Sequence, residues 1–253
     1  MNSLSSLLST RVPSELESAQ QKSFVTYTLY SLPSTPKGIP TITLLEARNV
    51  VAAAGTTGLR TWEAALHLGN YLCTHAMDLV QGKSILELGA GTGYISVLCS
   101  KHLRASHVLS TDGSNEVVAG LPTNFSLNGL QGESTIEGKE LRWGHALIGG
   151  EHPQWNAGHQ IDLVLGADLT YDESIIPALV STFDELFVLY PRVKILIAAT
   201  IRNPTTVQRF LETCRENGYV IGDIDFGIPG QDLQEGLFYS DKVPIQLCMI
   251  TKP

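Results

Sequence analysis

Residues 85–93 join an apolar run to a glycine-rich turn, and this pattern can hold a ligand that carries a nucleoside. The stretch reads Ile-Leu-Glu-Leu-Gly-Ala-Gly-Thr-Gly. Gly89, Gly91 and Gly93 lack the β-carbon that would keep the backbone away from a ligand, and they can adopt backbone angles closed to other residues. Asp112 ends a second apolar run. The alternative is an ordinary strand, turn and helix that uses its glycines for geometry alone.

The spacing of these glycines disfavours a dinucleotide site. Such a site needs the pattern G-x-G-x-x-G, in which the third glycine packs the helix against the strand. Counted from Gly89 the third position is Tyr94, and counted from Gly91 it is Ser96. A nicotinamide-dependent reductase is therefore a weak alternative. Glu87, two residues before the first glycine, points to another class of cofactor.

The stretch from Glu87 to Gly93 resembles the E-x-G-x-G-x-G motif of class I methyltransferases that depend on S-adenosyl-L-methionine (SAM). In that family the loop wraps the methionine end of the cofactor, and an acid at the tip of the second strand binds the ribose hydroxyls. The resemblance implies that SAM is the cofactor and that Glu87, Gly89, Gly91 and Gly93 contact it. It also implies that Asp112 is the ribose-binding acid.

The tetrad Asp-Leu-Thr-Tyr at 168–171 forms a second candidate cluster, just past the apolar run 161–166. It resembles the D-x-x-Y/F motif of the family 16 seven-β-strand protein lysine methyltransferases. A lysine, whose pKa is about 10.4, must lose its proton before its nitrogen can attack, at a cost of roughly 4–5 kcal/mol at pH 7. The resemblance implies that Asp168 both contacts the cofactor and binds the lysine nitrogen, and that Tyr171 walls the lysine channel. In the alternative interpretation, Asp168 only caps the helix that follows.

Residues 55–68 resemble the segment G-T-T-G-L-x-T-W-x-A-A-L-x-L of one branch of family 16, the eukaryotic elongation factor 2 lysine methyltransferases. In the wider family the tryptophan of this segment lies against the cofactor, which would give Trp62 that role. The resemblance runs from about residue 40 to the C-terminus, and it implies a protein substrate, elongation factor 2. Composition explains little of this segment, and the alternative is that Arg60 and Trp62 are only a surface ion pair and a packing anchor at a helix entrance.

Two further residues follow apolar runs and could reach the same ligand. Trp143 could stack on adenine and exclude water with its apolar face; the alternative is a core or edge residue. Arg202 could touch a protein substrate, and a loop ion pair is an equal alternative. No cluster with metal-ligand spacing is visible in the sequence, so no metal is predicted.

These residues need elements that bring them to one edge of a sheet. Open α/β sheets bind ligands at the carboxyl ends of their strands, and the candidates fall there repeatedly. From residue 84 onward apolar runs alternate with helical patterns, which predicts strands joined by crossover helices. The predicted strands are 84–89, 107–111, 139–143, 161–166, 193–200, 219–226 and 245–251, and the predicted helices are 62–72, 93–103, 114–128, 173–190 and 204–217.

Together these features predict an α/β fold with a Rossmann-like seven-stranded class I methyltransferase sheet. We expect the sheet to be mostly parallel with an antiparallel last strand, and helices to cover both faces. Alternating residues at 24–30 and 41–45, around the turn signal 33–38, predict an N-terminal β-hairpin extension. The expected organisation is an N-terminal arm and hairpin over residues 1–50 and a SAM-dependent methyltransferase domain over residues 51–253.

Composition limits the partners and the compartment. The formal net charge of −8 disfavours contact with a nucleic-acid backbone and suits a basic protein partner. The four cysteines are far apart with no C-x-x-C pair, which suits a reducing compartment. No apolar run reaches membrane-spanning length. We therefore expect a cytoplasmic monomer that binds neither nucleic acid nor membrane directly.

The combined interpretation is methyl transfer from SAM to a lysine side chain of a protein, most specifically elongation factor 2. Methylation of another protein or of a small molecule is one alternative. A non-catalytic SAM-binding scaffold is another. Methylation of an amino group in DNA or RNA is disfavoured, because an N/D-P-P-Y/F motif would be expected and Leu169 and Thr170 stand where its prolines would be.

Overall fold

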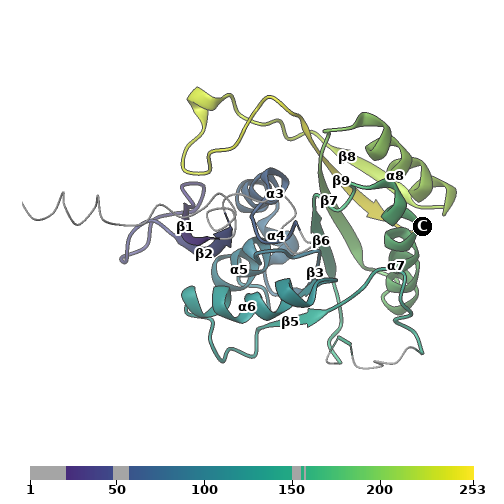
Figure 1. Ribbon diagram of the computed structural model, residues 1–253, viewed down its shortest axis with the longest axis horizontal. Coiled ribbons are helices and arrows are strands. Elements are labelled where there is room, and N and C mark those ends of the chain that lie inside the picture. The colour runs from purple at the N-terminus through teal and green to yellow at the C-terminus, as the bar shows by residue number, and fades with distance from the viewer. Residues whose placement is uncertain (1–20, 48–56, 150–154, 157) are drawn as a thin grey trace, which may run out of the picture.

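A seven-stranded sheet lies at the centre of the computed structural model, which describes residues 21–47, 57–149, 155–156 and 158–253 (Figure 1). Its strand order is β5-β4-β3-β6-β7-β9-β8, and a separate two-stranded sheet joins β1 to β2. The strands are β1 Lys22–Thr28, β2 Thr41–Ala47, β3 Ser84–Leu88, β4 His107–Asp112, β5 Ile136–Glu140, β6 Leu163–Ala167, β7 Lys194–Thr200, β8 Val220–Ile224 and β9 Ile245–Thr251.

Helices separate most of these strands, as the sequence predicts. The α-helices are α3 Glu63–Thr74, α4 Met77–Val80, α5 Tyr94–Val97, α6 Asn115–Leu127, α7 Ile176–Leu189 and α8 Pro204–Glu216. The predicted helix 93–103 is α5 continued by a π-helical turn, Leu98–His102, and α7 is preceded by a 3₁₀ turn, Glu173–Ile175. A second 3₁₀ turn, Gln231–Leu233, was not predicted, and neither was α4.

The direction of the strands confirms the predicted fold class. β5, β4, β3, β6 and β7 pair in parallel, whereas β9 runs antiparallel to both β7 and β8. The crossover connections therefore place the carboxyl ends of β3, β4, β6 and β7 on one edge of the sheet, where such folds bind ligands.

Apolar side chains point to both faces of the central strands, so helices cover both faces (Figure 1). On β3, Ile85 joins the core beneath α3, α5 and α6, whereas Leu86 joins the core beneath α7 and α8. On β7, Leu196 and Ile195 divide between the same two cores. This alternation explains why the central strands read as continuous apolar runs.

The position predicted for the third strand was wrong by three residues. Residues 139–143 were expected to form it, but β5 spans Ile136–Glu140 and pairs with β4 from Val108 to Asp112. β5 is an edge strand with a single fully buried residue, Ile136, so its sequence carries little apolar signal. The apolar residues that suggested the later position belong to the loop that follows, which covers the candidate site.

The predicted hairpin forms, and α6 holds it through two asparagine side chains. Asn128 accepts from the backbone N–H of Thr43 at 3.0 Å and donates to its carbonyl at 2.7 Å, while Asn124 accepts from the N–H of Leu45 at 2.8 Å. Both asparagines are buried because they satisfy the open backbone edge of β2.

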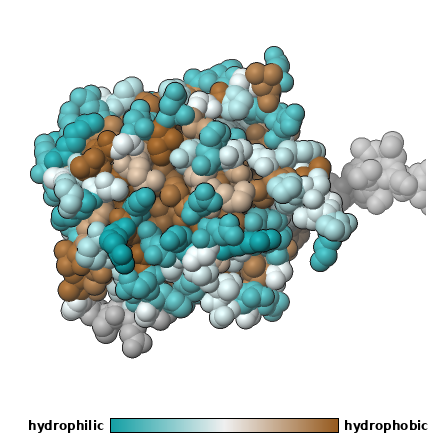
Figure 2. Space-filling view, turned by 180° about the vertical axis from the view of Figure 1, so that it is seen from behind, coloured by the Kyte–Doolittle hydropathy of each residue, from teal (hydrophilic) through white to brown (hydrophobic). Residues whose placement is uncertain are grey.

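The surface of the described residues mixes apolar and polar side chains, and on the face in Figure 2 the brown apolar areas lie between teal polar ones. All four cysteines are buried and unpaired. Among the described residues, no helix is long and apolar enough to cross a membrane. The N-terminal arm that was predicted before the hairpin lies almost wholly outside the described part of the chain.

Candidate active site

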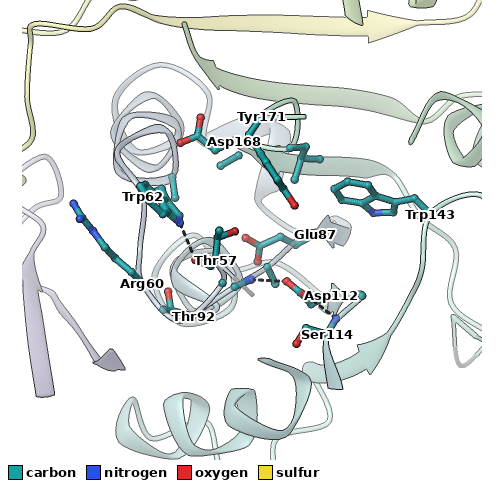
Figure 3. Close-up of a pocket in the computed structure, with 18 of the residues that line it drawn as sticks. Thr57, Arg60, Trp62, Glu87, Thr92, Asp112, Ser114, Trp143, Asp168 and Tyr171 are labelled. Carbon is teal, nitrogen blue, oxygen red and sulfur yellow. Dashed lines mark hydrogen bonds between the residues drawn. The ribbon is translucent and has the colours of Figure 1, made fainter. Parts of the chain in front are cut away.

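A cavity of about 860 Å³ opens at the carboxyl edge of the sheet (Figure 3). Its volume falls in the range of sites that enclose small ligands and cofactors. Eight of the nine residues predicted for the site line it; Gly93 does not. The eight are Trp62, Glu87, Gly89, Gly91, Asp112, Trp143, Asp168 and Tyr171.

The glycine-rich loop adopts backbone angles that favour glycine. Gly89, Gly91 and Gly93 have φ angles of 65°, 54° and 80°. A β-carbon on Gly91 would lie 3.1 Å from the carbonyl oxygen of Gly58, within the cavity wall. A β-carbon on Gly93 would instead meet the Leu121 side chain at 2.9 Å. Gly93 therefore allows α6 to pack closely, and it shapes the loop without facing the cavity.

Glu87 is a buried carboxyl group at the base of the cavity. Its Oε2 accepts from the backbone N–H of Ser96 at 2.9 Å and from the Ser96 hydroxyl. Burial raises the pKa of Glu87 to about 8, although the hydrogen bonds from Ser96 oppose the shift. A positively charged ligand group beside Glu87 would favour its ionised form, so this acid suits a cationic ligand.

Asp112 is held in a fixed orientation at the tip of β4. Its two carboxylate oxygens accept from the backbone N–H groups of Gly91, at 3.1 Å, and Ser114, at 2.9 Å. Burial raises its pKa, whereas these hydrogen bonds lower it. Each oxygen keeps a second lone pair, so the carboxylate can still accept from hydroxyl groups in the cavity.

Asp168 stands at the end of β6 with a strained backbone. Its φ angle of 55° is unusual for a residue with a β-carbon, and such strain clusters at functional sites. Thr200 holds the carboxylate from β7: its N–H donates to Oδ1 at 2.8 Å and its hydroxyl donates to Oδ2 at 3.0 Å. The side chain is thereby fixed facing the cavity.

The helix-capping interpretation of Asp168 was wrong. The cap before the turn Glu173–Ile175 is Asp172, whose carboxylate accepts from the N–H of Ser174 at 2.8 Å. Tyr171 lies between the two aspartates, and its hydroxyl points into the pocket (Figure 3). Partial burial raises its pKa, and the negative charges of Asp112 and Asp172 add to the shift. At 62% exposure, Tyr171 forms the rim of the pocket.

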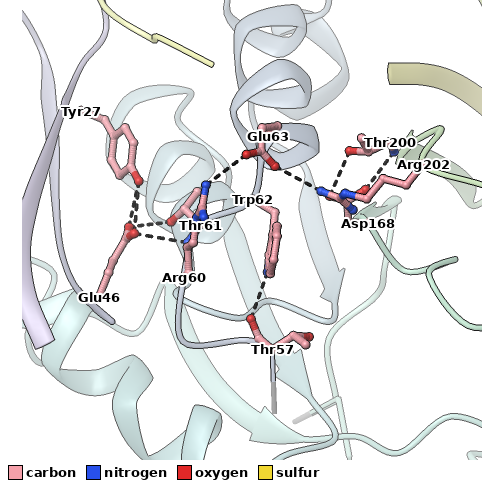
Figure 4. Close-up of polar contacts among 10 residues, drawn as sticks. All are labelled: Tyr27, Glu46, Thr57, Arg60, Thr61, Trp62, Glu63, Asp168, Thr200 and Arg202. Carbon is pink, nitrogen blue, oxygen red and sulfur yellow. Dashed lines mark hydrogen bonds and ion pairs between the residues drawn. The ribbon is translucent and has the colours of Figure 1, made fainter. Parts of the chain in front are cut away.

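Trp62 stands at the entrance of α3 between two guanidinium groups (Figure 4). Its indole N–H donates to the carbonyl of Thr57 at 2.9 Å, which fixes the ring. The guanidinium carbons of Arg60 and Arg202 lie 5.1 and 5.0 Å from the ring centre, within reach of a cation–π interaction.

Glu63 links the two arginines, and Arg202 continues the chain of charges to Asp168. Glu63 bonds Arg60 at 3.0 Å through Oε1 and Arg202 at 3.1 Å through Oε2. The same Nη2 of Arg202 lies 3.3 Å from Oδ2 of Asp168. The ion-pair alternative for both arginines is therefore what the structure contains. The sequence could not pair Arg202 with Asp168, because the contact joins the ends of two different strands.

Trp143 follows β5 and closes the far side of the cavity. An added β-carbon on Gly89 would lie 2.6 Å from Cδ2 of Leu169, so the missing side chain of Gly89 leaves room for Leu169, and the Trp143 ring lies 3.4 Å from the same position. The ring also packs against the core beneath α7 and α8. Trp143 thus packs on the core with one part and lines the cavity with another, and its stacking on adenine stays a prediction.

These features fit a nucleoside cofactor with a cationic end. The bare backbone of the glycine loop admits the ligand, Asp112 keeps acceptors for hydroxyl groups, and Trp143 offers a ring face for a base. Asp168 supplies negative charge for a positive group, and Glu87 would supply it where such a group favours its ionised form. Thr92 was not predicted, yet its hydroxyl bonds that of Thr61 at 2.6 Å and ties the loop to the entrance of α3.

Among the described residues, one group of side chains of the kinds that bind metal ions lies away from this cavity, at the beginning of β4. The ligand atoms of His107, Glu137 and His159 lie within 4.8 Å of one another. The two imidazole rings, however, are stacked 3.7 Å apart at 14°, so their in-plane lone pairs run parallel and do not converge on one ion. The group shares no residue with the cavity wall.

The sequence matches a model of the lysine methyltransferase family over residues 45–217. It is 49% identical over 252 residues to protein-lysine N-methyltransferase EFM3 of Chaetomium thermophilum, an alignment that covers 100% of this chain and 74% of the relative. It is 38% identical to EFM3 of Saccharomyces cerevisiae and 30% identical to human protein-lysine N-methyltransferase EEF2KMT. These two alignments cover 70% and 67% of this chain but only 54% and 53% of the relatives.

Solved structures share the fold at low sequence identity. An O-methyltransferase from Bacillus cereus, in complex with SAH, has a TM-score of 0.51 at 16% identity, over 80% of this chain and 86% of that one. A precorrin-6y C5,15-methyltransferase from Geobacter metallireducens has a TM-score of 0.51 at 10% identity, over 78% and 92% of the two chains. Fold, site and sequence therefore agree: this chain belongs to the lysine methyltransferase family, and SAM is its cofactor.

Proposed function

We propose that this protein transfers a methyl group from SAM to a lysine side chain of translation elongation factor 2. The observation that supports lysine as the acceptor is the carboxylate of Asp168, fixed at the rim of the cofactor cavity. The choice of elongation factor 2 rests on the likeness of residues 55–68 to that branch of the family and on relatives such as EEF2KMT.

The residues of the cavity divide into two groups by proposed role: those that hold the cofactor and those that hold the substrate amine. Glu87, Gly91 and Asp112 hold the cofactor, and SAM supplies a methyl group activated on a sulfonium sulfur. Asp168 accepts a hydrogen bond from the substrate amine and points its nitrogen into the cavity. Tyr171 covers the amine and limits the water around it. Proximity and orientation provide most of the acceleration in such a transfer, and the amine proton leaves to solvent.

The test is labelled methyl transfer from SAM to purified elongation factor 2, followed by mass-spectrometric localisation. A single modified lysine that is absent with the Asp168→Asn protein would support both the substrate and the role of the carboxylate. Label on lysines of another protein would keep the chemistry and replace the substrate. Tight SAM binding without transfer to any protein or amine would point to a scaffold role.

A further inference from the structure

Arg202 forms an ion pair with Asp168, the carboxylate that a substrate lysine would contact under the proposed function. Its guanidinium bonds Oδ2 of Asp168 at 3.3 Å and Glu63 at 3.1 Å, and it lies against the Trp62 ring (Figure 4). Arg202 itself lines the cavity and is 43% exposed in its side chain. The pair therefore lies within the proposed lysine site.

This pairing changes what Asp168 can do for a lysine. A free carboxylate would attract the ammonium form and make its proton harder to remove. A carboxylate already neutralised by a guanidinium, which keeps its charge at every relevant pH, attracts the ammonium weakly. Any nitrogen that donates a hydrogen bond to the same carboxylate lies within about two hydrogen-bond lengths, roughly 6 Å, of the guanidinium. At that distance one positive charge disfavours another.

We propose that Arg202 is a positioning residue that lowers the pKa of the substrate amine by neutralising Asp168. The neutral amine, which is the nucleophile, is then the form that the site prefers. Asp168 keeps a free lone pair with which to orient an amine N–H. This inference rests on the proposed function, because it assumes an amine as the methyl acceptor.

The other charges around the Arg202–Asp168 pair are themselves paired, so Arg202 determines the net charge beside Asp168. Arg60 on the loop before α3 compensates Glu63, and each is joined to the other at 3.0 Å. The remaining titratable groups that line the cavity are Glu87, Tyr94, Asp112, Arg142 and Tyr171, with Asp172 beside them. Arg142, the one cation among them, is itself paired with Glu140 at 2.6 Å.

The first experiment is the pH dependence of methyl transfer to elongation factor 2 by Arg202→Met, Arg202→Lys and the unchanged protein. Removal of the guanidinium should raise the pKa of the bound amine, so the acidic limb of kcat should move up by about one to two pH units. At pH 7, kcat should fall about tenfold or more while KM for the protein substrate also falls. At high pH, kcat should approach that of the unchanged protein.

Two variants separate charge from structure. Arg202→Lys restores a cation, so the acidic limb of the kcat profile should return toward its original position. If Arg202 acted only through packing, lysine would not restore the limb. Arg209→Met removes one positive charge from the exposed face of α8, where Arg209 pairs with Glu216 at 3.8 Å, and should leave rate and profile unchanged. A uniform loss of kcat at all pH values with Arg202→Met would overturn the proposal.

The second experiment needs no protein substrate. n-Butylamine, which presents the amine of a lysine side chain, is titrated into the protein saturated with S-adenosylhomocysteine, and binding is followed by NMR. Affinity for the unchanged protein should rise with pH up to about 10, because the neutral amine is preferred. The Arg202→Met protein should bind about tenfold tighter at pH 7 and lose affinity above pH 10.

The outcomes of the two experiments distinguish the proposals. Opposite pH slopes for butylamine support the role of Arg202 even if elongation factor 2 accepts no methyl group, in which case only the substrate is wrong. Equal affinity and slope in both proteins overturn the inference and leave the proposed function standing wherever lysine methylation is observed.

Discussion

Asp168 combines a strained backbone with a carboxylate that is fixed from a neighbouring strand. The rest of the fold must offset the strain of the φ angle of 55°, and Thr200 holds the side chain with two hydrogen bonds. β6 ends before Asp168, so neither feature is needed to form this strand. The sequence placed this residue correctly because an acid just after an apolar strand is a local pattern. It could not reveal that Arg202 pairs with Asp168, because this contact depends on how β7 lies beside β6.

Asp168→Asn should separate transfer from cofactor binding. Asparagine tolerates a left-handed backbone, and its amide oxygen can still accept from Thr200, so the fold should persist. We expect SAM affinity within about threefold of the unchanged protein and a fall in transfer of about a hundredfold or more. Calorimetric titration with SAM and a single-turnover assay measure the two effects.

The matched control is Asp172→Asn, which removes the neighbouring exposed charge that caps the turn at Glu173–Ile175. It should leave transfer nearly intact. If Asp168→Asn weakens SAM binding as much as it slows transfer, Asp168 is a structural or cofactor residue and its proposed role at the amine is wrong.

Glu87 should make the stability of the cofactor-free protein depend on pH. Its pKa is raised from 4.5 to about 8 in the folded protein, so the folded state holds a proton that the unfolded state releases between these values. The contribution is fully present below pH 4.5 and is lost as pH rises to about 8. The free energy of unfolding should fall over this interval by on the order of 4 kcal/mol.

Urea unfolding at several pH values between 5 and 9 measures this slope for the unchanged protein and for Glu87→Gln. Glutamine preserves the shape and can accept from Ser96, but it does not titrate. The slope between pH 5 and 8 should therefore be smaller in the variant. Parallel curves would show that Glu87 ionises normally in the fold.

At the scale of elements, β2 and α6 form a support for the glycine loop. Asn124 accepts from Leu45 of β2 and donates to the carbonyl of Thr92 at 2.8 Å, so one side chain joins the hairpin to the cofactor loop. Buried Glu46, the next residue of β2, supports the entrance of α3, where its Oε1 accepts from the Thr61 hydroxyl at 2.7 Å. The loop is therefore held from two sides.

The sequence predicted each of these elements but not their contacts. Helical periodicity places Asn124 and Asn128 one turn apart, yet it contains no information about the strand edge that makes them buried. The same limit explains the displaced β5: an edge strand with few apolar residues gives a weak local pattern, and pairing with β4 decides its bounds. Central strands were predicted well because both faces are apolar.

Asn124→Ala should loosen the cofactor loop without touching the cavity wall. The change leaves the N–H of Leu45 and the carbonyl of Thr92 without this partner, so the free energy of unfolding should fall by about 1–3 kcal/mol. Because the loop loses its support, SAM affinity should also fall by about fivefold or more. Ser126→Ala, an exposed change on the same helix, is the matched control and should do neither. SAM affinity unchanged in Asn124→Ala would show that the support does not reach the loop.

At the scale of the whole molecule, the hairpin shares its core with the sheet. Leu29, Ile42 and Leu44 pack in the same cluster as Ile85 of β3 and the helices on that face. The sequence suggested an extension over residues 1–50 beside a domain over 51–253, a division based on a change of local pattern. That division stays a prediction, and the shared burial leads us to expect that the two parts unfold as one cooperative unit.

Ile42→Ala tests this cooperativity. The side chain is fully buried, so its truncation should lower the free energy of unfolding by about 2–5 kcal/mol. The three tryptophans, Trp62, Trp143 and Trp155, all lie outside the hairpin and report on the sheet and its cavity. If the molecule unfolds as one unit, their fluorescence and the far-ultraviolet circular dichroism should shift together in the variant, in a single transition.

The control is Ile39→Ala, at a partly exposed position between β1 and β2, which should shift neither signal appreciably. A hairpin that melts alone, with the tryptophan transition unmoved by Ile42→Ala, would restore the division near residue 50 and remove the mechanical link between the hairpin and the cofactor loop.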